Sequence, residues 1–235
     1  MPKGLLGKKI GMSQYFTSTG DAIAATLIEV GPCIALQIKT KDKDGYSAVQ
    51  LGFDKKSKKT TKRPELGHFK KAKTEPLRFI KEVAIDNAKE IKPGQQFFID
   101  TFKQGDFVDI SGLSIGKGFQ GGMKRWHWHG GGASHGSMTH RRPGSIGASA
   151  YPSRVLKGQH MPGHMGNDWV TVQNLEVMQI NKDSNLMLVK GAVPGSTGNY
   201  LVIRKAIKGK KKPVHKQEVK AEAEVKATGK KEPKK

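Results

Sequence analysis

The stretch ISGLSIGKGFQGGMKRWHWHGGGASHGSMTHRRPGSIGASAYPSRVLKGQHMPGHMGN, residues 110–167, contains no aspartate and no glutamate. It holds seven Lys or Arg, six of the eight His, two of the three Trp and about half of the glycines. Glycine allows close backbone approach, Lys and Arg neutralise phosphates, and aromatic rings stack on bases. This composition favours a segment that lies against a polyanion.

Runs rich in Ile, Val, Leu, Thr and aromatic residues lie on both sides of this stretch, separated by turn signals such as Gly31-Pro32. The expected strands are 9–16, 22–30, 34–40, 46–53, 97–100, 106–110, 169–173, 175–180, 186–189 and 199–207. The simplest fold is mainly β, a closed barrel assembled from both flanks. Residues 110–167 are then a very long insertion, and connections of that length tend to be functional or disordered.

Four parts are therefore expected along the chain. Residues 1–109 and 168–207 form the barrel body, with a small irregular or helical insertion at about 55–92 in which 65–72 and 76–83 are short helical turns. Residues 110–167 form the long extended loop. The basic tail 208–235 has eleven Lys, four Glu and no aromatic residue, so we expect it to be disordered.

The charge of the whole chain points to nucleic acid or another anionic surface. The 235 residues carry a formal net charge of +22, with positive charge in the loop, the tail and the body alike. No window reaches the 18 or so apolar residues of a membrane span, and the N-terminus is too polar for a secretory signal. We expect a cytoplasmic protein that avoids membranes, in which the single Cys33 is a buried thiol.

Three clusters are the strongest candidates for contacts with RNA. KRWHWH at 124–129 interleaves cations with π-faces, and we expect one of its two Trp to pack on protein. HRRPGS at 140–145 is a second cationic turn. The run KKSKKTTKR at 55–63 is either a solvated loop or a phosphate contact, and the global charge favours contact. The side chains expected to bind RNA are Lys8, Lys9, Lys58, Lys59, Lys62, Arg63, Lys117, Lys124, Arg125, Trp126, His127, Trp128, His129, His135, His140, Arg141, Arg142, Arg154 and Lys157.

Other kinds of site fit the sequence less well. Residues 116–121 match the dinucleotide fingerprint G-x-G-x-x-G. That fingerprint needs a helix directly after it, which we do not expect here, and an acidic residue about 20 positions on, which the sequence lacks. The histidines of the loop lack Cys or carboxylate partners, and the neighbouring cations oppose a metal ion. No carboxylate lies near them in sequence to orient a catalytic His. We therefore expect no enzyme, no cofactor, no metal and no small-molecule substrate.

Several motifs carry a resemblance to a known family. The chain is similar to the L-three family of large-subunit ribosomal proteins, in its bacterial form, over about residues 3–207. The matching motifs are GLLGKKIGMSQYF at 4–16, DISGLSIGKGFQGGMKR at 109–125, SHG at 134–136, HRRPGSIG at 140–147, MPGHMG at 161–166 and LVKGAVPG at 188–195.

The resemblance implies a translation-type β-barrel seated on large-subunit ribosomal RNA, with the loop reaching towards the peptidyl transferase centre. It also implies a role in early subunit assembly and contacts with neighbouring ribosomal proteins. An RNA-binding or RNA-chaperone protein outside the ribosome is the alternative. The implied loop apex is formed by Ala148, Ser149, Ala150, Tyr151 and Pro152.

The chain departs from the family at that apex. Many bacterial members have Gln-Asn-Gln after SerIleGly, and some methylate the second Gln. Here the matching residues are Ala148, Ser149 and Ala150. Methylation of an amide cannot occur at Ala150, and the contact that a side-chain amide would make is lost.

Overall fold

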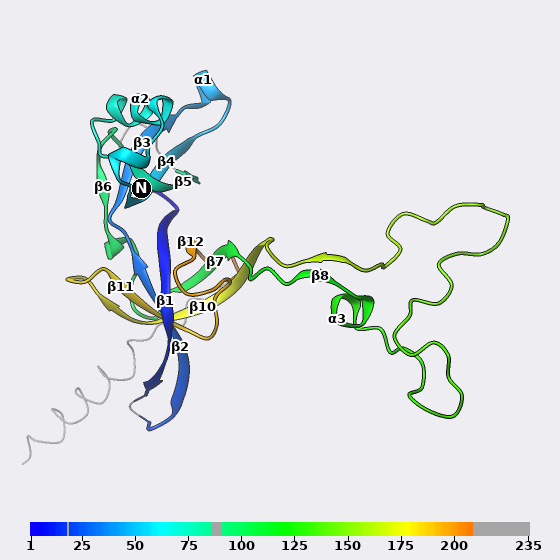
Figure 1. The fold of residues 1–235 in the computed structure, drawn as a ribbon. Helices are drawn as coiled ribbons and strands as arrows, with labels where there is room; N and C mark the ends of the chain where they lie inside the picture. The colour runs from blue at the N-terminus through cyan, green and yellow to red at the C-terminus, as the bar shows by residue number, and fades with distance from the viewer. Residues whose placement is uncertain (18, 86–90, 209–235) are drawn as a thin grey trace, which may run out of the picture. The chain divides into compact units, whose positions relative to one another are not determined.

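The computed structural model describes residues 1–17, 19–85 and 91–208 (Figure 1). By their internal contacts these residues form two units. The first unit contains Met1–Gly112 together with the residues from Thr171 onwards, and the second unit contains Leu113–Val170. The expectation of a disordered tail concerns residues that, apart from Lys208, lie outside the described part of the chain.

The first unit contains a closed six-stranded barrel, which confirms the mainly β prediction. Going round the barrel, the strands are β1 (Gly4–Phe16), β12 (Tyr200–Lys205), β7 (Phe107–Leu113), β10 (Trp169–Asn181), β11 (Leu186–Lys190) and β2 (Ala22–Val30). Strands from both sides of the loop therefore close one barrel. Leu5 lies opposite Ile203, and Ile203 lies opposite Ile110 on its other side.

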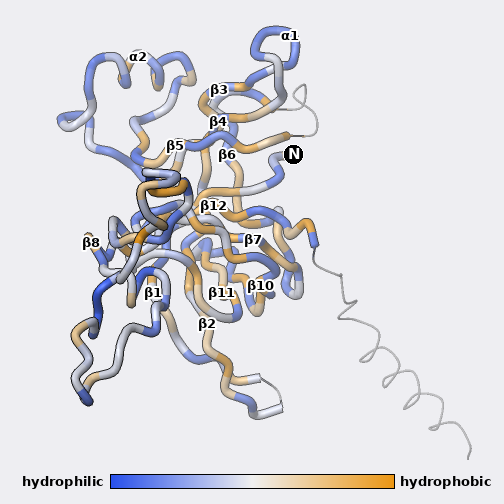
Figure 2. Tube along the Cα trace, turned by 90° about the vertical axis from the view of Figure 1, so that its right-hand side faces the viewer, coloured by the Kyte–Doolittle hydropathy of each residue, from blue (hydrophilic) through white to orange (hydrophobic). Residues whose placement is uncertain are grey.

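The core of the barrel follows from the two-residue period of these strands. Leu5, Ile28, Ile110, Met187 and Ile203 are fully buried, and each such side chain stabilises the fold by roughly 1.5–3 kcal/mol. In Figure 2 hydrophobic residues are concentrated along β2, β10 and β11. In β11 buried positions alternate with half-buried ones, as the two-residue period of a strand predicts. Leu5 and Leu6 of β1, and Leu201–Ile203 of β12, are instead consecutive buried residues.

A second, four-stranded sheet corrects the expected extent of the barrel body. Residues 34–40 and 46–53 were expected in the barrel, but they lie in a separate sheet. Alternating apolar residues look alike in either sheet, so the pattern predicts a strand without predicting its partner. In sheet order the strands are β5 (Leu77–Ala84), β4 (Ala48–Lys55), β3 (Cys33–Lys39) and β6 (Gln96–Phe97).

Two local predictions were wrong in this region. Residues 76–83 were expected to be helical, but β5 pairs along almost all of β4, because Leu77 and Val83 can be buried there while the residues between them are half-buried or exposed. Residues 97–100 were expected to form a strand. The strand ends at Phe97, and a 3-10 helix, η3 (Ile99–Thr101), buries Ile99.

The helical prediction for 65–72 was correct. Helix α2 (Arg63–Lys71) has a proline in its first turn, where the missing N–H costs no bond, and it buries Phe69. Phe69 clusters with Leu36 and Leu77 of the second sheet. The shorter helices of this unit are α1 (Lys41–Asp44) and η1 (Lys58–Thr60).

Cys33 is buried, as the sequence predicted. Its thiol lies 3.3 Å from both the N–H and the carbonyl oxygen of Leu6, and burial raises the pKa of the thiol to about 12.

The expectation of two separate strands, broken near residue 174, was wrong. Asn174 has a φ of 58° and its N–H donates to Asp109 Oδ1 at 2.9 Å, so β10 continues through it. Among the described residues, no helix is long and apolar enough to cross a membrane.

Candidate nucleic-acid interface

The second unit begins as a two-stranded stem. Strand β8 (Gly118–Gln120) pairs with the antiparallel β9 (Gly163–Met165). The N–H of Ser114 donates to the carbonyl of Asp168 at 2.9 Å, extending the ladder. Gly166 has a φ of 77°, and a Cβ there would overlap the carbonyl oxygen of Ile115. The stem therefore requires glycine at this position, and it keeps the two arms of the loop side by side.

Beyond the stem, two side chains fasten one arm to the other. Helix α3 (Gly122–Trp126) presents Arg125 Nη1 and Trp126 Nε1, which donate to the carbonyl oxygen of Met161 at 2.7 and 2.8 Å. The Trp126 ring also stacks on His160, with centroids 3.9 Å apart and planes 1° apart. We call this cluster of Arg125, Trp126, His160 and Met161 the loop clip. It shows that the loop has tertiary structure of its own.

Trp128 also packs on protein. It is half-buried, and a Cβ at Gly122 would overlap its ring. One of the two Trp was expected to pack on protein, but both do so, Trp128 against Gly122 and Trp126 against His160. His160 and the Met161 carbonyl were missed as partners, because no local sequence signal relates them to residues some 35 positions away.

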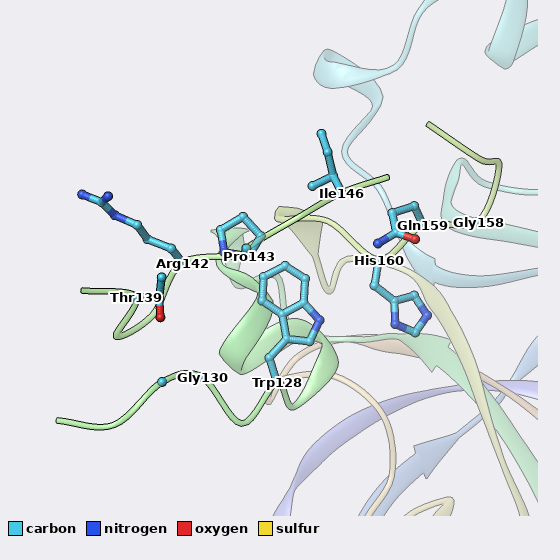
Figure 3. A pocket seen from close by; sticks show the side chains of 11 residues that line it. Trp128, Gly130, Thr139, Arg142, Pro143, Ile146, Gly158, Gln159 and His160 are labelled. Atoms are coloured by element: carbon cyan, nitrogen blue, oxygen red, sulfur yellow. The ribbon is translucent and has the colours of Figure 1, made fainter. Parts of the chain in front are cut away.

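Trp128 lines a hollow of about 590 Å³ within the second unit (Figure 3). Pro143, Ile146 and His160 also line it, as do glycines whose backbone groups are accessible. In Figure 3 the Arg142 guanidinium points away from Trp128. The hollow therefore offers flat rings and backbone groups, with a cation at its margin.

The rest of the loop is almost entirely exposed. The implied apex includes Tyr151, which is 90% exposed. His140 is exposed but has an internal role, because its Nδ1 donates to the carbonyl of Gly132 at 2.9 Å. The predicted loop residues that present exposed side chains are Lys117, Lys124, His127, His129, His135, Arg141, Arg142, Arg154 and Lys157.

The charges of this unit are one-sided. Its only acidic side chain is Asp168, against seven Lys or Arg. The loop cations therefore have almost no internal carboxylate with which to pair. A surface of this kind attracts a polyanion and repels few of its phosphates.

Lys9 corrects one predicted contact. Its Nζ donates to the carbonyl oxygens of Val193 at 3.1 Å and Gly195 at 2.9 Å, and burial lowers its pKa. Lys9 is only 9% exposed, so its ammonium binds the protein and is removed from the candidate interface. The preceding Lys8 is half-buried and lies 3.9 Å from Asp54. Two adjacent lysines of one strand point to opposite faces, and the sequence alone does not show which one is inside.

The basic run 55–63 divides into two parts. Lys55 pairs with Glu75 at 3.1 Å, and Lys56 pairs with Glu65 at 2.8 Å. The four predicted cations that follow are exposed at η1 and the start of α2, namely Lys58, Lys59, Lys62 and Arg63. Only this second part resembles a surface that is free to meet phosphate.

The structure does not fit the two alternative kinds of site, a dinucleotide site and a metal site. A short helix, α3, does follow the G-x-G-x-x-G match, which corrects one reason for setting it aside. However, β8 pairs only with the antiparallel β9, whereas a dinucleotide fold places this motif on a parallel sheet. In the described part of the chain, no group of three or more His, Cys, Asp or Glu could hold a metal ion.

Comparison with known proteins then identifies the family. The sequence matches the family Ribosomal protein L3 over residues 8–186. Proteins named large ribosomal subunit protein uL3 are similar along most of their length. The one from Pelotomaculum thermopropionicum is 52% identical over 210 residues, 89% of this chain and 100% of the relative. The one from Halalkalibacterium halodurans is 51% identical with the same coverage, and the one from Brachyspira hyodysenteriae is 49% identical over 89% of this chain and 96% of its own. The chain therefore belongs to the ribosomal protein L3 family.

Proposed function

We propose that this protein is a structural constituent of the large ribosomal subunit, that its second unit binds large-subunit ribosomal RNA, and that it assists early subunit assembly. Membership of the L3 family and the names of the uL3 relatives support the first part. The protein acts by counter-charge and by filling space between RNA segments, without chemistry of its own.

The observation that carries the RNA proposal is the charge of the second unit. Seven cations and one carboxylate lie in a unit whose side chains are mostly exposed. Each Lys or Arg that meets a phosphate releases a counterion, so binding weakens as salt rises. The loop clip also favours binding to RNA, because a loop that is already ordered loses less conformational entropy when it binds.

We further propose that residues 148–152 form the part of the loop nearest the peptidyl transferase centre. Ala148, Ser149 and Ala150 offer no side-chain amide. Tyr151 is the only large side chain in this apex and is 90% exposed. Contacts at the apex therefore come from the Tyr151 ring and from backbone groups.

Sedimentation of the full-length tagged protein tests membership of the subunit. We expect it to remain with large subunits through a high-salt gradient. A large free pool that binds RNA without sequence preference would favour the alternative of an RNA-binding or chaperone protein outside the ribosome.

Charge neutralisation tests the RNA-binding surface. Arg141→Gln with Arg142→Gln should reduce the dependence of log K on log salt for isolated large-subunit RNA by about 1.4–1.8. Lys41→Gln with Lys43→Gln is the matched control, because it removes two exposed cations beside Asp42 and Asp44. Equal salt slopes for both double variants would contradict the proposal.

A further inference from the structure

The paired ends of β1 and β2 have a composition opposite to that of the loop. The chain has 42 Lys or Arg, yet residues 10–38 contain none, and Asp21 and Glu29 are their only charged side chains. We call residues 10–16 and 22–26 the hairpin arm. In Figure 1 the blue arm extends beyond β11 of the same unit, and Asp21 lies in the turn at its end.

The hairpin arm exposes large apolar side chains. Ile10, Met12 and Phe16 are 40%, 53% and 66% exposed. The register of β1 against β2 shifts between Lys9 and Gly11, so Ile10 occupies a bulge. A cluster of exposed apolar groups on a sequence otherwise rich in charge marks an interaction surface more often than a solvated one.

The arm also has an open strand edge. Strand β1 pairs with β12 only over Gly4–Lys8, whereas residues 10–16 pair only with β2 within the described part of the chain. Alternate N–H and C=O groups along 10–16 therefore point away from the hairpin without a neighbouring strand. Such an edge is a template for an added strand.

These features distinguish between two kinds of macromolecular occupant. RNA would set phosphates beside apolar side chains and Asp21, with no cation in the arm to neutralise them. An extended protein segment would satisfy the open backbone groups, cover Met12 and Phe16, and place its own cations near the exposed Asp21. The charge of the arm is complementary to a basic partner.

We propose that the hairpin arm docks an extended, apolar and basic segment of another protein, which adds as a strand along residues 10–16. The inference rests on the proposed function in one respect, because we expect to find this partner in the large ribosomal subunit. The surface is separate from the RNA-binding set, since none of its residues belongs to that set.

Photo-crosslinking in intact cells tests the identity of the occupant. A photoreactive benzoylphenylalanine is placed at Phe16, at Ile10 or, as a matched control in the loop, at Met138, which is 85% exposed. After denaturing purification, we expect Phe16 and Ile10 to give one and the same protein adduct, attached through a peptide that contains Lys or Arg. We expect Met138 to give an RNA adduct. RNA adducts at both hairpin positions, or no adduct at either, would overturn the docking proposal.

A charge substitution gives an independent test. Met12→Lys with Phe16→Lys should lower the yield of the protein adduct from Ile10 by about tenfold, because two ammonium groups would have to be buried. If RNA were the occupant, the added cations would preserve or strengthen the contact, and that result would refute the proposal. Absence of RNA adducts at Met138 would instead count against the proposed function. The adducts at Phe16 and Ile10 would still decide the docking proposal, according to whether they contain protein or RNA.

Discussion

The two units of the molecule use their cations differently. In the first unit many lysines pair with carboxylates, as in the 2.9 Å ion pairs Lys39–Glu82 and Lys182–Asp100. In the second unit Asp168 is the only carboxylate for seven cations. Residues 1–112 and 171–208 hold 25 Lys or Arg against 15 Asp or Glu, so internal pairing can neutralise a large part of their charge, whereas the seven cations of the second unit depend almost wholly on external anions. Net charge alone would not separate these two surfaces.

Charge reversal in the loop should give the largest effect on this difference. Arg141→Glu with Arg142→Glu places acids in the acid-free segment, and we expect the affinity for large-subunit RNA to fall by about 100-fold at low salt. Lys41→Glu with Lys43→Glu, in α1 of the first unit, is the matched control and should change the affinity by less than about threefold. Filter binding over a salt series measures both variants. Equal losses would mean that net charge, and not the loop, determines binding.

A buried cation of the first unit provides the next test. Lys9→Met removes the two hydrogen bonds to Val193 and Gly195 and leaves their carbonyl oxygens without that donor, so we expect a loss of about 1–3 kcal/mol in the free energy of unfolding. The affinity for RNA should stay unchanged, because this ammonium is not available to phosphate.

Lys8→Met is the control for that experiment. Lys8 is half-buried and its ion pair with Asp54 is long, at 3.9 Å, so its removal should cost much less stability. Denaturant unfolding measures both variants. A loss of RNA affinity in Lys9→Met without a loss of stability would return Lys9 to the RNA-binding set.

The contrast between Lys8 and Lys9 shows which features of the structure the sequence predicts and which it does not. The barrel could be predicted from the sequence, because strand-like apolar patterns lie on both sides of the loop. The separate sheet of β3 to β6 was not predictable from that alternation, since partner choice depends on contacts distant in sequence. Lys9 and the loop clip were missed for the same reason. The Met161 carbonyl accepts a hydrogen bond from Arg125, and nothing in the local sequence around either residue indicates this contact.

The loop clip should contribute a smaller, local stability. Trp126→Ala removes the stack on His160 and one bond to Met161, together worth roughly 1–2 kcal/mol. We expect limited proteolysis within 113–170 to become about 5–30-fold faster, while the melting temperature of the barrel stays the same. Trp126→Phe, which keeps a ring for stacking but lacks the N–H, should lie between the two. A large drop in the melting temperature would show that the second unit does not open independently of the barrel.

The smallest effect concerns a carboxylate that the first unit uses internally. Glu82 accepts hydrogen bonds from Lys39 and from the Tyr46 hydroxyl, and these partners lower its pKa below the ordinary value of 4.5. A carboxylate with a lowered folded-state pKa stabilises the protein fully above pH 4.5 and loses that contribution as the pH falls through the folded-state pKa. Glu82→Gln should therefore lower the melting temperature by about a degree at pH 7, and the difference from the parent protein should vanish in acid. A difference that persists unchanged at low pH would mean that Glu82 acts through packing, and the first unit would then owe less to internal charge pairing than its ion pairs imply.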